Sequence, residues 1–163
     1  MDLPKRKTTR LCGFDYSTHG AYFVTICTMK KAKLLSKIVG GGAFDTPKVC
    51  LSKIGKIVEK YILSTNNIPN VTVDKYVVMP NHIHIILFVN NEDGTSRAPS
   101  PTNSIIPHAI ATLKRFVNRE VRGNIFQRSY YDHVIRDYRD YTRVWEYIDQ
   151  NPARWQEDKY YTE

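Results

Sequence analysis

Two histidines in a β-rich run are the first residues of this sequence whose spacing could support chemistry. His82 and His84 flank Ile83 at the start of the segment from His82 to Val89, whose composition predicts a strand. Residues two apart on a strand point to the same face with Cα atoms about 6 to 7 Å apart, so both imidazoles can reach one cation. A bare His-x-His pair also occurs where both rings simply pack or face solvent, so this spacing needs further support.

The alternation of side chains along the same run supplies that support. One face of the predicted strand is apolar and consists of Ile83, Ile85 and Leu87. The other face begins with the two histidines and continues with Ile86 and Phe88. Polar side chains that enter a buried face need partners, and a metal ion would accept both imidazole nitrogens. The pattern favours a pair of metal ligands at one end of a buried sheet face.

A second pair of chemically useful residues lies near the end of the last predicted helix. Tyr147 and Asn151 are four apart, so their side chains lie one turn apart on nearly the same line. The phenol is a potential nucleophile, and the amide oxygen can complete a two-histidine metal site in which water or phosphate oxygens take the remaining positions. Because a residue before proline disfavours helical geometry, Asn151 can deviate from the ideal line.

Other tyrosines compete with Tyr147 for the role of nucleophile, because the chain contains eleven of them. Tyr138 and Tyr141 share an apolar helical stripe with Trp145, which favours a core role for both. Tyr130 and Tyr131 remain alternatives.

The elements that must position these residues follow from hydrophobic periodicity and turn residues. In chain order they are a strand at 21–28, a helix over 51–62, antiparallel strands at 71–78 and 82–89, a helix from 106 to a stop at Gly123, a strand at 130–136, and a helix from an N-cap at Asp137 to about Pro152. This order predicts an α+β, ferredoxin-like βαββαβ fold, an antiparallel sheet with helices on one face plus a C-terminal helix that carries Tyr147.

The remaining segments are predicted to be irregular parts of a single domain that spans residues 1–163. Residues 1–13 form a basic arm, and residues 90–104 form a flexible loop. Residues 30–46, which include a glycine triplet, are predicted to form a loop or an irregular hairpin.

The charge of the chain favours a polyanionic partner. Lysine and arginine number 24 against 16 acidic residues, a net charge of +8 with a pI near 9.4. Each basic residue is as compatible with a solvated surface as with a phosphate contact. The candidate DNA-binding residues are Lys5, Arg6, Lys7, Arg10, Lys114, Arg115, Arg119 and Arg122, and Tyr130 or Trp155 can stack on an unpaired base.

Three cysteines without Cys-x-x-Cys spacing argue against a disulfide framework and a structural zinc site. The basic N-terminus leads into no apolar region, and no stretch approaches the roughly 18 apolar residues of a membrane helix. We therefore expect a cytoplasmic protein with no membrane partner.

Two sets of motifs resemble a known family. The segment from Met79 to Leu87 is similar to the HUH motif of single-tyrosine, IS200-like transposases, in which two histidines flank one hydrophobic residue. The segments 126–136 and 147–155 are similar to the REP-associated tyrosine transposases, domesticated relatives that act on repetitive extragenic palindromes. The resemblance spans roughly residues 14 to 156.

The resemblance implies a role for each matched residue. Tyr147 would be the nucleophile, and His82, His84 and Asn151 would bind a divalent metal, Mg²⁺ or Mn²⁺, of which imidazole ligands favour Mn²⁺. The implied activity is that of a metal-dependent single-stranded DNA endonuclease and strand transferase with a 5′-phosphotyrosine intermediate, acting in transposition or DNA recombination. Palindromic or hairpin DNA would be the partner of a monomer or homodimer, without a small-molecule cofactor.

Two alternatives keep the same fold but change the chemistry. The chain could be a non-catalytic nucleic-acid-binding protein, such as a repressor or RNA binder, because fold alone does not determine function. It could also be a metal-dependent phosphodiesterase in which water is the nucleophile, which predicts no covalent adduct and tolerance of Tyr147→Phe.

Overall fold

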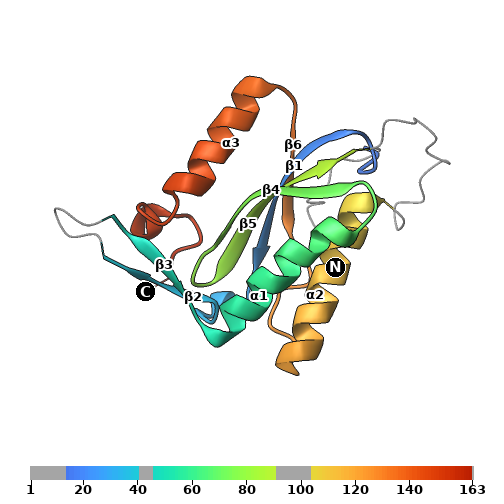
Figure 1. Cartoon of the computed structure of the whole chain (residues 1–163). Helices are drawn as coiled ribbons and strands as arrows, with labels where there is room; N and C mark the ends of the chain where they lie inside the picture. The colour runs from blue at the N-terminus through green and yellow to red at the C-terminus, as the bar shows by residue number, and fades with distance from the viewer. Residues whose placement is uncertain (1–13, 41–45, 91–103, 163) are drawn as a thin grey trace, which may run out of the picture.

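One antiparallel four-stranded sheet forms the centre of the computed structural model of this chain, which describes residues 14–40, 46–90 and 104–162 (Figure 1). Its strands are β1 (Gly20–Cys27), β4 (Val71–Val78), β5 (His82–Val89) and β6 (Tyr131–Ile135). They lie in the order β4-β5-β1-β6, and every neighbouring pair is antiparallel. The ferredoxin-like α+β fold predicted from the sequence is therefore confirmed.

A separate two-stranded hairpin precedes the first helix. It consists of β2 (Ser36–Val39) and β3 (Lys48–Leu51), so of the two predictions for residues 30–46 the hairpin is correct for β2. The second strand lies beyond that segment and includes Leu51, which was wrongly assigned to the following helix. The hydroxyl of Ser36 donates to the carbonyl of Val78 across 2.8 Å, which ties the hairpin to β4. The predicted basic arm and almost all of the predicted loop at 90–104 lie outside the described residues.

Helices α1 (Lys53–Ser64) and α2 (Ile105–Val121) cover one face of the sheet (Figure 1). The Ser52 hydroxyl accepts a hydrogen bond from the backbone N–H of Gly55 and caps α1, while α2 ends one residue before a left-handed Arg122. The sheet residues beneath them, among which are Ile83, Ile85 and Leu87, form the larger core cluster. The alternation read from β5 is thus confirmed.

Helix α3 (Tyr138–Gln150) covers the opposite face of the sheet, as Figure 1 shows. Its side chains Val144 and Ile148 pack against Phe23 and Ile86. The predicted apolar stripe was partly wrong, because Tyr138 is 82% exposed and Trp145 is 37% exposed. The buried line of α3 passes through Val144 instead, and the Lys75 ammonium lies over the ring of Trp145. None of the helices in the described residues has the length and apolar character that a membrane crossing requires.

Candidate active site

The two histidines of β5 converge on one point beneath α3. Both side chains are fully buried, and their Nε2 atoms lie 3.0 Å apart. The other ring nitrogens are held from behind, because His82 Nδ1 lies 2.8 Å from Asn81 Oδ1 and His84 Nδ1 lies 2.8 Å from Thr25 Oγ1. Hydrogen bonds to the ring nitrogen that does not bind the metal fix the orientation of metal-ligating imidazoles.

The orientation of Asn81 decides the tautomer of His82. Asn81 Nδ2 donates to the backbone carbonyl of Tyr160 across 2.8 Å, so the amide oxygen faces His82. His82 Nδ1 must then carry the proton, which leaves the Nε2 lone pair directed at His84. Burial lowers the pKa of His82 to about 4 and lowers the pKa of His84 well below its ordinary value. Both rings are therefore neutral at pH 7, the form that binds metals.

Tyr147 lies beside this pair, on the last full turn of α3. Its ring centroid is 5.2 Å from that of His84 and 6.0 Å from that of Phe23. The side chain is 38% exposed, so an incoming substrate can reach the phenol. Burial raises the pKa of the Tyr147 phenol, and the carboxylate of Asp158 raises it further. The resting phenol is therefore protonated at neutral pH.

Asn151 is 3% exposed and keeps helical geometry at the C-cap of α3, so it stays in line with Tyr147 despite the following proline. Its Nδ2 donates to Asp158 Oδ2 across 2.7 Å. Its Oδ1 is buried and has no hydrogen-bond partner among the described residues. An unpartnered buried oxygen costs about 1 to 3 kcal/mol, so this atom suits a cation or a water molecule.

Asp158 is the site residue that sequence reasoning missed. One ligand atom each from His82, His84 and Asp158 lies within 4.8 Å of the others, a spacing that can hold a metal ion. Tyr147 Oη also donates to Asp158 Oδ2 across 3.1 Å. No periodic pattern predicts this residue, because it follows the short helix η3 (Trp155–Glu157) in an irregular segment. Two imidazole nitrogens and a carboxylate oxygen therefore lie close enough to hold one ion, a donor set that suits Mn²⁺ or Mg²⁺.

The same C-terminal segment also places two aromatic rings against the histidines. The Tyr160 ring centroid is 4.7 Å from that of His82 and 5.8 Å from that of His84, and the Trp155 ring lies 5.9 Å from His82. Tyr160 is thus a second tyrosine beside the histidine pair, which the sequence did not single out. A hollow of about 180 Å³ lies beside Tyr147, and its walls also include Asn151 and Asp158.

Of the other tyrosines considered from the sequence, Tyr131 lies near the site, because it pairs with Thr25 across the sheet and Thr25 pairs with His84. Tyr131 is 43% exposed on β6, where the Lys159 ammonium lies 4.9 Å from its ring centroid. Tyr130 is half-buried next to the Lys114 ammonium. Tyr138 and Tyr141 occupy the first turn of α3, far along the helix from the site.

The candidate DNA-binding residues of α2 and its cap lie across the sheet from Tyr147, because α2 and α3 cover opposite faces. Arg115, Arg119 and Arg122 are exposed. The ammonium of Lys114 donates to the carbonyls of residues 127, 128 and 129 at 2.8, 3.2 and 3.1 Å. Lys114 thus anchors the segment before β6. The candidates Lys5, Arg6, Lys7 and Arg10 lie outside the described residues.

Comparison with known proteins finds similarity both in sequence and in structure. The sequence matches no protein-family model. An uncharacterized protein of Haemophilus influenzae is 30% identical over 178 residues, which cover 97% of this chain and 94% of that protein. The structure of a REP-associated tyrosine transposase bound to a REP hairpin superposes with a TM-score of 0.60 at 18% identity, covering 98% of this chain and 77% of the other. This second likeness shows a common fold.

Proposed function

We propose that this chain, which belongs to one family with the Haemophilus influenzae protein, is a metal-dependent enzyme that nicks and joins single-stranded DNA. Tyr147 is the nucleophile, and His82, His84 and Asn151 are metal ligands. The observation that carries the proposal is the meeting of a phenol, two convergent Nε2 atoms and a carboxylate at one end of a sheet face. The likeness to a transposase bound to a REP hairpin supports single-stranded or hairpin DNA as the substrate.

The residues present fit a divalent cation. His82 and His84 would supply their Nε2 atoms and Asn151 its Oδ1, while Asp158 offers a further oxygen close to both imidazoles. The Nε2 lone pair of His82 points at His84 Nε2 across 3.0 Å, a position at which it accepts either a proton from His84 or a cation. When bound, Mg²⁺ or Mn²⁺ would withdraw charge from the scissile phosphate.

The transfer step conserves both bonds and protons. Tyr147 Oη forms a bond to phosphorus while the bond between phosphorus and the 3′ oxygen breaks, leaving a 5′-phosphotyrosine and a 3′-OH. Asp158 Oδ2 already accepts the hydrogen bond of the phenol, so it is placed to take the proton that the 3′ oxygen finally receives through solvent. Because one phosphodiester replaces another, the 3′-OH can reverse the step without ATP.

A covalent adduct separates this proposal from its alternatives. Labelled single-stranded oligonucleotides that carry the palindromes flanking the gene are incubated with wild type, Tyr147→Phe and Tyr160→Phe, with Mn²⁺ or EDTA, and resolved on a denaturing protein gel. We expect an adduct that requires Mn²⁺ and is absent only from Tyr147→Phe.

Any other result would support a different activity or a different nucleophile. Cleavage without an adduct that persists in Tyr147→Phe would assign the attack to water, as in a phosphodiesterase. Loss of the adduct only in Tyr160→Phe would assign it to the C-terminal segment. DNA binding without cleavage in any protein would favour the repressor or RNA binder.

A further inference from the structure

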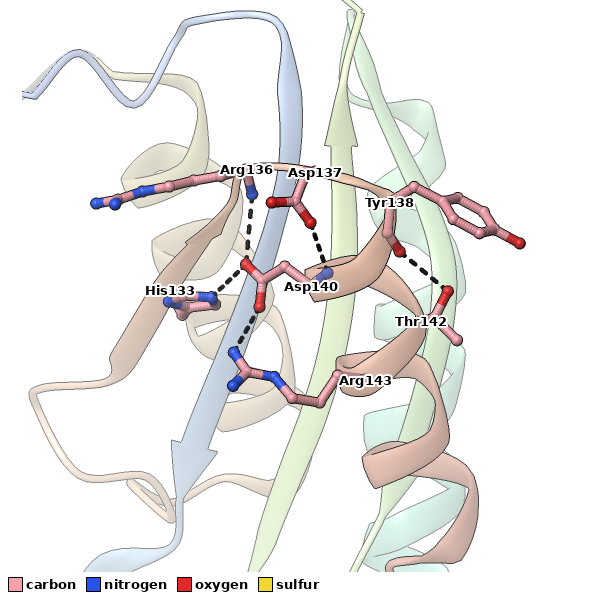
Figure 2. A network of polar contacts seen from close by, with 7 residues as sticks. All are labelled: His133, Arg136, Asp137, Tyr138, Asp140, Thr142 and Arg143. Atoms are coloured by element: carbon pink, nitrogen blue, oxygen red, sulfur yellow. Dashed lines mark hydrogen bonds and ion pairs between the residues drawn. The ribbon is translucent and has the colours of Figure 1, made fainter.

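An arginine-rich hollow lies beside the start of α3, on the same helix as Tyr147. It is an open depression of about 580 Å³ between β6 and the first turns of the helix. Its lining residues, most of which Figure 2 draws as sticks, are His133, Arg136, Asp137, Arg139, Asp140 and Arg143.

The two carboxylates of the hollow are used within the fold. Asp137 Oδ1 accepts a hydrogen bond from the backbone N–H of Asp140 across 2.8 Å and caps α3. Asp140 Oδ2 lies 2.7 Å from His133 Nε2, and its Oδ1 accepts from Arg143 across 2.6 Å (Figure 2). Each carboxylate thus serves a structural contact.

The guanidinium groups keep most of their donors available. Arg136 and Arg139 are exposed and form no side-chain ion pair among the described residues. Arg143 uses one nitrogen for Asp140 and is otherwise 74% exposed. A guanidinium carries five N–H donors in a planar fork that matches a phosphate, and the Asp140 contact fixes the direction of the Arg143 fork.

The position of the hollow relative to the nucleophile is determined by the helix. Arg143 precedes Tyr147 by four residues, which places the two side chains on nearly the same line with Cα atoms about 6 Å apart. The rise per residue places Arg139 about 12 Å from Tyr147 along the helix axis.

We propose that this hollow binds the phosphates of the DNA strand that flanks the scissile linkage, with Arg143 on the near phosphate and Arg139 and Arg136 on more distant ones. The inference rests on the proposed function for the direction of the strand. A single strand is the partner because the proposed function acts on one. Arg136 lies just before α3, and Arg139 and Arg143 lie on it, so their guanidiniums are spaced to contact successive phosphates of that strand. The hollow is a binding surface, and its arginines are positioning residues for a phosphate that Tyr147 attacks.

The test measures binding without cleavage. Fluorescein-labelled oligothymidylate is titrated in EDTA at several KCl concentrations with wild type, Arg136→Ala, Arg139→Ala and Arg143→Ala. The matched control is Lys56→Ala, which removes an exposed charge from α1 on the opposite face of the sheet. Affinity falls as salt rises, and we expect this dependence to be weaker in each arginine variant, with the magnitude of the slope of log affinity against log salt reduced by about 0.7. Lys56→Ala should keep the wild-type slope.

Two results would overturn the proposal. One is a wild-type slope in all three arginine variants, and the other is an equal loss of slope in Lys56→Ala, which would attribute binding to net charge. Arg139→Ala breaks no side-chain bond among the described residues, so it remains informative if Arg143→Ala does not fold. The adduct assay tests the proposed function separately. If the arginine variants lose slope but wild type forms no adduct, the DNA-binding surface is supported and the nicking activity is rejected.

Discussion

Tyr147 Oη donates a hydrogen bond to Asp158 Oδ2 across 3.1 Å, although the two residues are eleven positions apart and the end of α3 lies between them. The same carboxylate oxygen accepts from Asn151 Nδ2 across 2.7 Å. The C-terminal segment therefore brings a negative charge to the phenol and the metal ligands at once. In the resting protein this charge raises the pKa of Tyr147, and during attack it can receive the phenol proton.

Asp158→Asn separates these two effects. The substitution keeps the shape but removes the charge, so we expect the pKa of Tyr147 to fall towards its ordinary value while adduct formation slows by about 100-fold or more. Single-turnover gels measure the rate, and a difference titration of phenolate absorbance against Tyr147→Phe measures the pKa. A rate that increases as the pKa falls would show that Asp158 restrains the phenol and takes no proton from it.

His82→Ala is expected to abolish cleavage while leaving the affinity for single-stranded DNA within about twofold, because the ligand acts on the chemistry and basic residues supply the affinity. Adduct gels and anisotropy titrations on the same preparation measure both quantities. Loss of binding together with cleavage would indicate a folding role for this buried ring, which a thermal melt would detect.

Asn81→Ala tests the support behind the histidines without touching a ligand. Removing the acceptor of His82 Nδ1 frees the ring to change tautomer, so we expect affinity for Mn²⁺ to fall by about 10- to 100-fold. Calorimetric titration of Mn²⁺ measures the effect without any reaction. Asn66→Ala is the matched control, since Asn66 contacts Val73 on β4 away from the site; equal losses in both variants would contradict the prediction.

Acid should destabilise the metal-free protein through the histidine pair. Burial lowers the pKa of His82 from 6.5 to about 4 and also lowers that of His84, so the unfolded chain binds more protons than the folded one between these values. The free energy of unfolding therefore increases with pH across about pH 4 to 6.5 and levels off above it. Urea unfolding in EDTA at pH 5 and pH 7 measures the difference, which should shrink in the double variant His82→Gln, His84→Gln.

Lys114→Met distinguishes an anchor from a DNA contact. The variant loses hydrogen bonds to three carbonyls, so we expect a loss of about 1 to 3 kcal/mol in the free energy of unfolding. Arg115 is the next residue in the chain and is exposed, so Arg115→Ala should leave the free energy of unfolding unchanged. Chemical denaturation of both proteins provides the comparison, and equal stability of the two variants would argue against the anchoring role.

Local patterns in the sequence determined the main helices and strands of this protein and the faces on which their side chains lie. The strict alternation of β5 placed the histidines on one face and Ile83 on the other, because successive residues of a strand point in opposite directions. Asp137 marked the start of α3 through its capping chemistry, and the four-residue spacing put Tyr147 in line with Asn151. Each of these inferences depends on neighbours in the chain.

Only the tertiary structure decided which of those faces come into contact. The rotation of α3 about its axis left Tyr138 and Trp145 exposed and buried Val144, because the sheet beneath it selects the contact face. Asp158 and Tyr160 reach the histidines from an irregular segment, and Asn81 turns its oxygen to His82 only because its amide nitrogen bonds the carbonyl of Tyr160. These contacts join residues that are far apart in the chain, and no periodicity encodes them, since packing between elements creates them.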